Sequence, residues 1–208
     1  MTTLLHINAS ARGDLSRSRA LARTFIDGLL ARDPELTVDT LDLFEANLPE
    51  FGTHAAEAKL ALFTGKEQTP EQVAAWERAR AVFDRFAAAD LYVVNIPIWN
   101  ASVPYVFKQW VDIVTQPGWA FAFDPQSGYS GLLTDKRAVT VYTSGVHRPG
   151  VPVEFGSDFA TPFVADWLNF VGIKDTAEIR FAPTVLTEDA AAGFASAQER
   201  ARELAAGY

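Results

Sequence analysis

The sequence has 208 residues, 49% of them hydrophobic, and a formal net charge of −8. A chain of this length builds one sizeable core and is short for two, so we expect a single domain over residues 1–208. The acidic balance and the lack of a basic run argue against nucleic acid and anionic membranes as partners. The absence of cysteine excludes disulfides, thiolate metal sites and cysteine nucleophiles. With no signal-peptide pattern and no bilayer-length apolar segment, we expect a cytoplasmic protein.

The first half of the chain alternates strand-like and helix-like segments. Apolar runs and periodicity predict, in chain order, a strand at 3–8, a helix at 19–31, an edge strand at 36–43 and a short helix within 55–62. Thr69-Pro70-Glu71 is typical of a helix start, with Thr as N-cap and Pro at the first helical position. This helix is expected to run to about Ala88.

The second half continues the alternation. The expected elements are a strand from Leu91, a helix at 104–115, an excursion or hairpin at 116–133, a strand at 137–142, a helix at 158–171, a strand at 177–181 and a helix at 188–205. Gly172 is suited to ending the helix before it. Five strands alternating with helices predict an α/β fold, namely a flavodoxin-like doubly wound five-stranded parallel sheet with helices on both faces.

The segment after the third strand is the first candidate for a ligand site. In open α/β sheets, ligands bind past the carboxyl ends of strands, and here the residues at that edge are Pro97, Ile98, Trp99, Asn100 and Ala101. Backbone groups and the Asn100 amide suit the edge of a planar ring, with Trp99 lining the site. The alternative is a tryptophan that only packs against the loop and an asparagine that only closes a turn.

The loop after the first strand is rich in hydroxyl groups, from Ser10, Ser16 and Ser18, with Arg17 among them. Neither a Gly-x-Gly-x-x-Gly pattern nor a Gly-Lys-Ser/Thr pattern is present. Serine hydroxyls at the start of a helix suit a terminal phosphate monoester, and Arg17 could offset its charge. The alternative is that Ser16 or Ser18 merely caps the helix.

The loop after the fourth strand, Thr143, Ser144, Gly145, Val146 and His147, lies beside the third strand's loop in this topology. Its N–H groups could reach the same ring. His147 could act as a general acid, proton donor or anion partner, because imidazole titrates near neutrality. The alternative is a solvent-facing loop histidine.

Metal and hydrolase chemistry are disfavoured. The three histidines, His6, His54 and His147, are scattered without paired spacing, so no metal site is expected. There is no Gly-x-Ser-x-Gly nucleophile elbow, and Ser144 lacks the flanking glycines of one. The acidic residues at 124, 135 and 158 are better explained as turn or cap residues.

Taken together, the three loops resemble those of the FMN-dependent NADH azoreductases, flavodoxin-like enzymes that also reduce quinones. The resemblance covers nearly the whole chain. It is carried by Ser10, 16–18, 97–100, 108–112, 118–121, 131–133 with Lys136, 143–147 and 163–172.

The resemblance implies an enzyme that binds FMN and takes electrons from NADH or NADPH. Ser10 and residues 16–18 would hold the FMN phosphate, residues 98–101 would pass the ring's edge, and residues 143–146 would face its pyrimidine end. A quinone or azo acceptor would then stack where the nicotinamide had been, which is a ping-pong two-electron mechanism with no obligatory catalytic acid or base. The flavin carries the hydride chemistry and the protein orients it. His147 is at most auxiliary.

The resemblance also implies a homodimer in which the partner chain walls each site, with Phe123 and Phe170 reaching across. Two departures from the family pattern stand out. The 143–146 loop is one residue shorter and poorer in glycine. Ala101 replaces a frequent aromatic residue, which implies a more open acceptor pocket, lined by Trp99 in its place. Two alternatives share the fold: an NADPH-dependent type of FMN reductase and a flavodoxin-like electron carrier.

Overall fold

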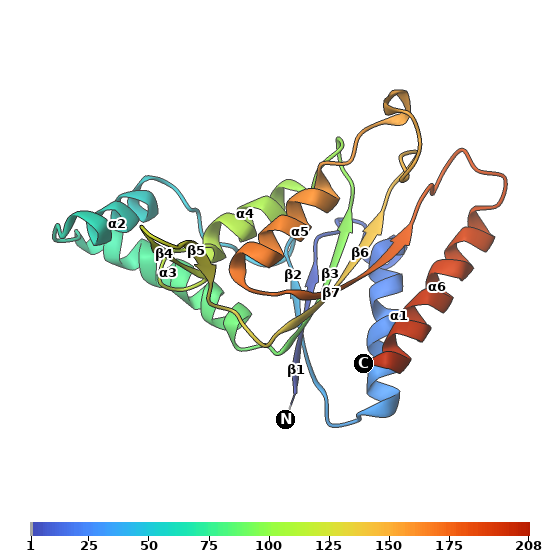
Figure 1. Cartoon of the computed structure of the whole chain (residues 1–208), viewed down its shortest axis with the longest axis horizontal. Coiled ribbons are helices and arrows are strands. Elements are labelled where there is room, and N and C mark those ends of the chain that lie inside the picture. The colour runs from blue at the N-terminus through green and yellow to red at the C-terminus, as the bar shows by residue number, and fades with distance from the viewer. Residues whose placement is uncertain (1) are drawn as a thin grey trace.

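The computed structural model describes residues 2–208 and contains a five-stranded parallel sheet in the order β2-β1-β3-β6-β7 (Figure 1). The strands are β1 (Thr3–Asn8), β2 (Thr37–Asp42), β3 (Leu91–Pro97), β6 (Arg137–Thr143) and β7 (Asp175–Phe181). In chain order, the chain moves from β1 to one side for β2 and then to the other side for β3. The switch point therefore lies between β1 and β3, where doubly wound folds bind their ligands. The predicted fold class is confirmed.

The predicted elements are present, with ends displaced by a few residues. The helices are α1 (Arg17–Arg32), α2 (Thr53–Thr64), α3 (Pro70–Ala87), α4 (Tyr105–Val114), α5 (Ala160–Val171) and α6 (Ala190–Gly207), with single 3-10 turns at Gly13–Leu15 and Val153–Phe155. The excursion expected at 116–133 contains a hairpin of β4 (Phe121–Asp124) and β5 (Gly128–Gly131). Helix α5 starts later than expected because Asp158 stays outside it and accepts a hydrogen bond from the Thr161 amide at 2.8 Å.

One face of the sheet is covered by α1 and α6, which lie side by side (Figure 1). Leu21 and Phe25 of α1 and Ala197 and Ala201 of α6 are buried against alternate residues of the central strands. The two helices approach closely at Gly28, where an added Cβ would lie 2.7 Å from Ala205 Cβ. A larger residue at this position would therefore force the helices apart.

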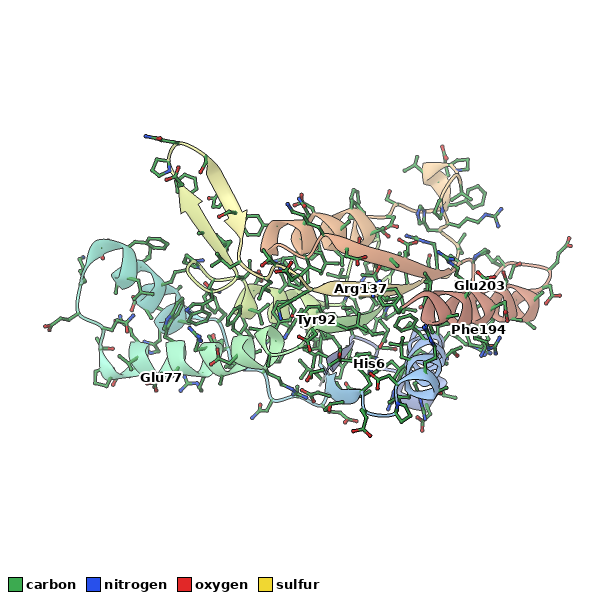
Figure 2. The ribbon with its side chains drawn as sticks, turned by 60° about the horizontal axis from the view of Figure 1, so that its bottom comes forward. His6, Glu77, Tyr92, Arg137, Phe194 and Glu203 are labelled. Atoms are coloured by element: carbon green, nitrogen blue, oxygen red, sulfur yellow. The ribbon has the colours of Figure 1, made fainter. Side chains whose placement is uncertain are left out.

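The other face is covered by α3, α4 and α5, whose aromatic side chains form the larger core. Trp110 and Phe86 are fully buried and meet edge to face, with ring centroids 5.0 Å apart, and Trp167 packs on both. The α2–α3 pair extends beyond the sheet (Figure 1), and the β4–β5 hairpin projects from the body (Figure 2). Within residues 2–208, no helix has the length and hydropathy of a transmembrane span.

Local sequence signals explain where several elements begin. Thr69 caps α3 as predicted, and it exchanges hydrogen bonds with Gln72 in both directions. Gly172 ends α5 with φ 106°, a left-handed value that glycine adopts at low cost. Strand β2 pairs only with β1 and is partly exposed, as its alternating pattern predicted for an edge strand.

Candidate functional site

The loop from β1 into α1 gathers three buried serines at the first turn of α1. Ser16 is the N-cap residue of α1, so the capping alternative holds for its oxygen, which accepts the Arg19 amide at 3.1 Å. Ser10 Oγ accepts the Arg12 amide at 3.4 Å, and Ser18 Oγ accepts Asn95 Nδ2 at 3.2 Å. Accepting an N–H leaves the hydrogen of a hydroxyl free to donate. Ser16 Oγ and Ser18 Oγ lie 3.2 Å apart and share one such hydrogen, so the other is left for a ligand. Capping and anion binding are therefore compatible here.

The segment after β3 forms a tight turn at the same edge of the sheet. The backbones of Trp99 and Ser102 exchange hydrogen bonds of 2.8 and 2.9 Å. Between them, Asn100 and Ala101 have positive φ angles of 48° and 65°, as in the type I′ turns of two-residue hairpins. The cost of a left-handed alanine is of the order of 1 kcal/mol, so the surrounding structure holds this turn in place.

The loop after β6 is tied to its neighbours on both sides. The Ile98 amide donates to the Thr143 carbonyl at 2.8 Å, and the Ser144 amide donates to the Phe181 carbonyl at 3.3 Å. Thr184, from the connection between β7 and α6, donates to the Gly145 carbonyl at 2.8 Å. Within residues 2–208, the Gly145 and Val146 amides donate to no backbone carbonyl. The same holds for the His147 amide, so these three N–H groups are the available backbone donors of this loop.

The three loops meet around one cleft of about 660 Å³ at the carboxyl edge of the sheet. The predicted site residues that line this cleft are Ser10, Ser16, Arg17, Ser18, Pro97, Ile98, Trp99, Thr143, Ser144 and Gly145. The structure thus brings together three segments that are far apart in the sequence, at the edge where the topology placed them.

The other predicted site residues lie outside the walls of this cleft. Asn100 and Ala101 form the tip of the turn, and Val146 and His147 follow the lining part of their loop. The partly buried His147 places Nδ1 at 3.1 Å from the Gly156 carbonyl oxygen, so the histidine ties its own loop together. Their roles toward a ligand stay predictions.

Phe123 and Phe170 lie in a different region from the cleft. Both belong to an aromatic cluster with Phe121 and Tyr129, in which Phe170 contacts Tyr129 at 5.4 Å and Phe123 contacts Tyr129 at 4.9 Å between ring centroids. Phe123 is 59% exposed on the hairpin. Neither residue lines the cleft of its own chain, which leaves only contact from a second chain for their predicted role.

Sequence reasoning missed one wall of the cleft. The residues concerned are Arg12, Phe181, Thr184, Val185, Ala190, Ala191 and Phe194. Most belong to the end of β7 and the start of α6, and Phe194 lies on α6 beside α1 (Figure 2). The sequence could have indicated this wall, because a helix that follows a parallel strand begins at the carboxyl edge of the sheet, and α6 follows β7.

The electrostatics of the cleft favour an anion. Among the described residues that line it, Arg12 and Arg17 are basic and none is acidic, although the whole chain has a net charge of −8. The Arg17 guanidinium lies 4.7 Å from the centroid of the Phe194 ring, a cation–π contact that holds it at the rim. The positive N-terminal end of the 16-residue α1 points at the same place.

The geometry of residues 2–208 does not contain the Ser-His-Asp arrangement of a hydrolase. His147 is bonded to Gly156, and within residues 2–208 it makes no hydrogen bond to Ser144. Asp124 accepts the Gln126 and Ser127 amides in a turn, and Asp158 caps α5 and pairs with Arg180. The two acids are thus turn and cap residues, as the sequence indicated.

Comparison with known proteins agrees with this geometry. Residues 2–205 match the model of a family described as having the flavodoxin-like fold. An FMN-dependent NADH:quinone oxidoreductase of Ruegeria pomeroyi is 43% identical over 194 residues, which cover 93% of this chain and 95% of that protein. The chain therefore belongs to the flavodoxin-like family of FMN-dependent NADH:quinone oxidoreductases. A protein of the same description from Nitratidesulfovibrio vulgaris is 38% identical and covers 99% of both chains.

Solved structures give the same result. An azoreductase from Bacillus anthracis superposes with a TM-score of 0.91 at 25% identity, and all of both chains is covered. The azoreductase AzrA superposes with a TM-score of 0.87 at 26% identity. The resemblance inferred from the three loops is confirmed.

Proposed function

We propose that this protein is an FMN-dependent oxidoreductase that uses NADH to reduce quinones and azo compounds. The observation that carries the proposal is the cleft itself. Three buried serine hydroxyls and two arginines line it, together with Trp99 and the Gly145 loop. The names of the relatives, which are FMN-dependent NADH:quinone oxidoreductases and azoreductases, point to the same chemistry.

The residues of the cleft suit the parts of FMN. Ser10, Ser16 and Ser18 would donate their hydroxyl hydrogens to phosphate oxygens, and Arg17 would offset the charge. Bound FMN would supply hydride transfer at its ring, a chemistry that belongs to the cofactor. The free Gly145 and Val146 amides would donate to the pyrimidine end of the ring, where negative charge collects on reduction.

The remaining roles follow from the position of each residue. Trp99 would wall the acceptor position, because it lines the cleft beside Pro97 and Ile98. Ala101 leaves the turn beside it without a large side chain. Donor and acceptor would occupy this one place in turn, which is the physical basis for a ping-pong order.

The quaternary structure that we propose is a homodimer. A groove of about 970 Å³ between α4 and α5 is lined by Val103, Tyr105, Phe163, Trp167 and Phe170 among others, and we call it the α4–α5 groove. These apolar side chains, with charged residues such as Lys108 and Asp166 beside them, have the composition of a protein–protein contact, and we expect a partner to cover them. Phe170 and the exposed Phe123 would then approach the partner's cleft. We also propose a single domain and a cytoplasmic location.

The decisive experiment is an absorbance spectrum of the purified protein after addition of FMN and desalting. We expect a retained flavin band that NADH bleaches without oxygen and that a quinone restores. A colourless protein would contradict the proposal. Parallel lines in double-reciprocal plots at several quinone concentrations would support the ping-pong order, whereas intersecting lines would exclude it.

Two alternatives give different results in the same experiment. An electron carrier would need a separate reductase before NADH bleached its flavin. An FMN reductase would turn over with free FMN as acceptor and release it reduced. Replacing NADH by NADPH at equal concentration measures the donor preference directly.

A further inference from the structure

A chain of buried amide side chains lies beneath the serines of the cleft. Asn95, in the centre of the sheet on β3, is fully buried and is the direct neighbour of Asn8 on β1. Asn95 Nδ2 lies 2.7 Å from Asn8 Oδ1 and 3.2 Å from Ser18 Oγ, and Asn95 Oδ1 lies 2.8 Å from His6 Nε2. His6 lies in the molecule's interior (Figure 2). The network thus joins the sheet directly to the first turn of α1.

The directions of the hydrogen bonds made by the two amide side chains follow from contacts with groups that can only donate or only accept. The Ser10 backbone N–H can only donate, and it lies 3.1 Å from Asn8 Oδ1. Asn8 Nδ2 lies 2.6 Å from a carboxylate oxygen of Asp42, which accepts. These two contacts orient the Asn8 amide, with its oxygen toward Ser10 and Asn95 and its nitrogen toward Asp42.

The orientation of Asn8 sets that of Asn95. Because Asn8 presents an acceptor, the atom of Asn95 that faces it must be the Nδ2 donor. The same nitrogen donates to Ser18 Oγ, and the Asn95 oxygen is left for His6. Burial lowers the pKa of His6, so the ring is neutral, with its proton on Nε2.

The direction of the Ser18 hydroxyl is the part of this hydrogen-bond network that reaches the cleft. Since Ser18 Oγ accepts from Asn95, its own hydrogen points away from Asn95, either toward Ser16 Oγ, which lies 3.2 Å away, or toward the cleft. The hydrogen bond between the two serines can run in either direction. Ser16 Oγ in turn accepts the Arg19 amide. We propose that Asn95 is a positioning residue that holds the Ser18 hydroxyl as an outward donor and so makes the cleft selective for a phosphate monoester. This inference rests on the proposed function, because the phosphate in question is that of FMN.

A purely structural role for Asn95 predicts something different. In that case its replacement would loosen the whole carboxyl edge of the sheet and weaken every ligand of the cleft alike. A role through Ser18 affects only ligands that carry a phosphate. Riboflavin has the ring and the ribityl chain of FMN without the phosphate, so the pair of ligands separates the two roles.

The test is a double-mutant cycle with Asn95→Leu and Ser18→Ala, in which FMN and riboflavin are titrated into the flavin-free full-length protein and flavin fluorescence is followed. Leucine is close to asparagine in size and removes the donor. We expect Asn95→Leu to weaken FMN binding roughly tenfold and to leave riboflavin binding within about twofold. The double variant is expected to bind FMN no more weakly than Ser18→Ala alone, because Asn95 acts through Ser18.

The matched control is Thr140→Val on the neighbouring strand β6, which removes a buried hydroxyl that donates to Ala177 at 3.4 Å, outside the cleft. It should change neither affinity. Additive losses in the cycle, or equal losses for FMN and riboflavin, would overturn the inference. If Asn95→Leu does not fold, as judged by thermal melting, Asn95→Ala replaces it in the cycle. A wild-type protein that binds no FMN would instead refute the proposed function.

Discussion

The cleft and the α4–α5 groove lie on either side of the Trp99–Ser102 turn, and they differ in size and in the charges that line them. Trp99 lines the smaller cleft, and Ser102 lines the groove, which at about 970 Å³ is the larger hollow. The cleft gathers hydroxyls, two arginines and unpaired amides. The walls of the groove combine aromatic side chains, such as Phe163 and Trp167, with charged side chains of both signs, such as Lys108 and Asp166.

This difference shows that size alone does not identify a cofactor site. Charge-bearing ligands need donors whose geometry is fixed in advance, and the cleft has them because the sheet and α1 hold each serine in place. The groove has aromatic side chains beside acidic and basic ones, a mixture that suits another protein surface better than a phosphorylated ligand. The two regions therefore divide cofactor binding and assembly between them.

The largest expected effect is a loss of FMN affinity when the serines proposed to hold the phosphate are replaced. Replacing Ser16 and Ser18 together by alanine removes two hydroxyls that we expect to donate to a charged phosphate. Each such bond contributes about 1.5 to 3 kcal/mol, so FMN affinity should fall roughly a thousandfold, as measured by fluorescence titration. The sedimentation coefficient of this double variant should equal that of the wild type, because the serines lie outside the proposed dimer interface. A loss smaller than tenfold would mean that the phosphate binds elsewhere.

The second largest effect is expected on dimer stability, when the α4–α5 groove is altered. Phe163→Asp places a charge on a surface that we expect to be buried between two chains, and it should raise the dimer dissociation constant roughly a hundredfold or more. Analytical ultracentrifugation measures this directly. Leu186→Asp is the matched control, because Leu186 is 87% exposed and lines neither region. An unchanged dimer in the Phe163 variant would exclude the groove as the interface.

A third prediction concerns the support beneath the cleft. Burial lowers the pKa of His6 below 6.5, with Arg19 and Arg23 on α1 acting in the same direction and Asn95 and Asp42 opposing them. The unfolded chain therefore binds a proton at a higher pH than the folded chain does. The His6 contribution to the free energy of unfolding is complete above about pH 6.5 and falls below it, by at most about 1.4 kcal/mol per pH unit.

The measurement is the difference in free energy of unfolding between wild type and His6→Gln, followed from pH 7.5 to 5. Glutamine can donate to Asn95 but does not titrate. The difference should shift in favour of the variant as the pH falls. A constant difference would show that His6 does not change protonation in this range.

The smallest effect concerns the turn between the two regions. Ala101 has φ 65°, a conformation that glycine adopts without strain. Ala101→Gly should raise the free energy of unfolding by about 0.5 to 1 kcal/mol in urea titrations, with the gain in the native state partly offset by a more flexible unfolded chain. Gly207→Ala, at a helix end with open space around it, is a control for glycine content. Destabilisation by Ala101→Gly would show that the alanine methyl group contributes packing.

The sequence alone determined the order of strands and helices, and with it the edge of the sheet at which Ser16, Trp99 and Gly145 meet. These features depend on local signals: apolar periodicity, caps such as Thr69, and turn residues after each strand. They also depend on the rule that parallel strands bring their carboxyl ends to one edge. The family resemblance rested on the same loops.

Only the tertiary structure decided which distant residues complete the site. Asn8 and Asn95 are 87 positions apart and become partners through the parallel register of β1 and β3, which no local pattern specifies. The start of α6 became a wall of the cleft because α6 packs against α1, with Phe194 under Arg17. Packing between helices and pairing between strands depend on the whole chain at once, and this is why these contacts appear only in the folded molecule.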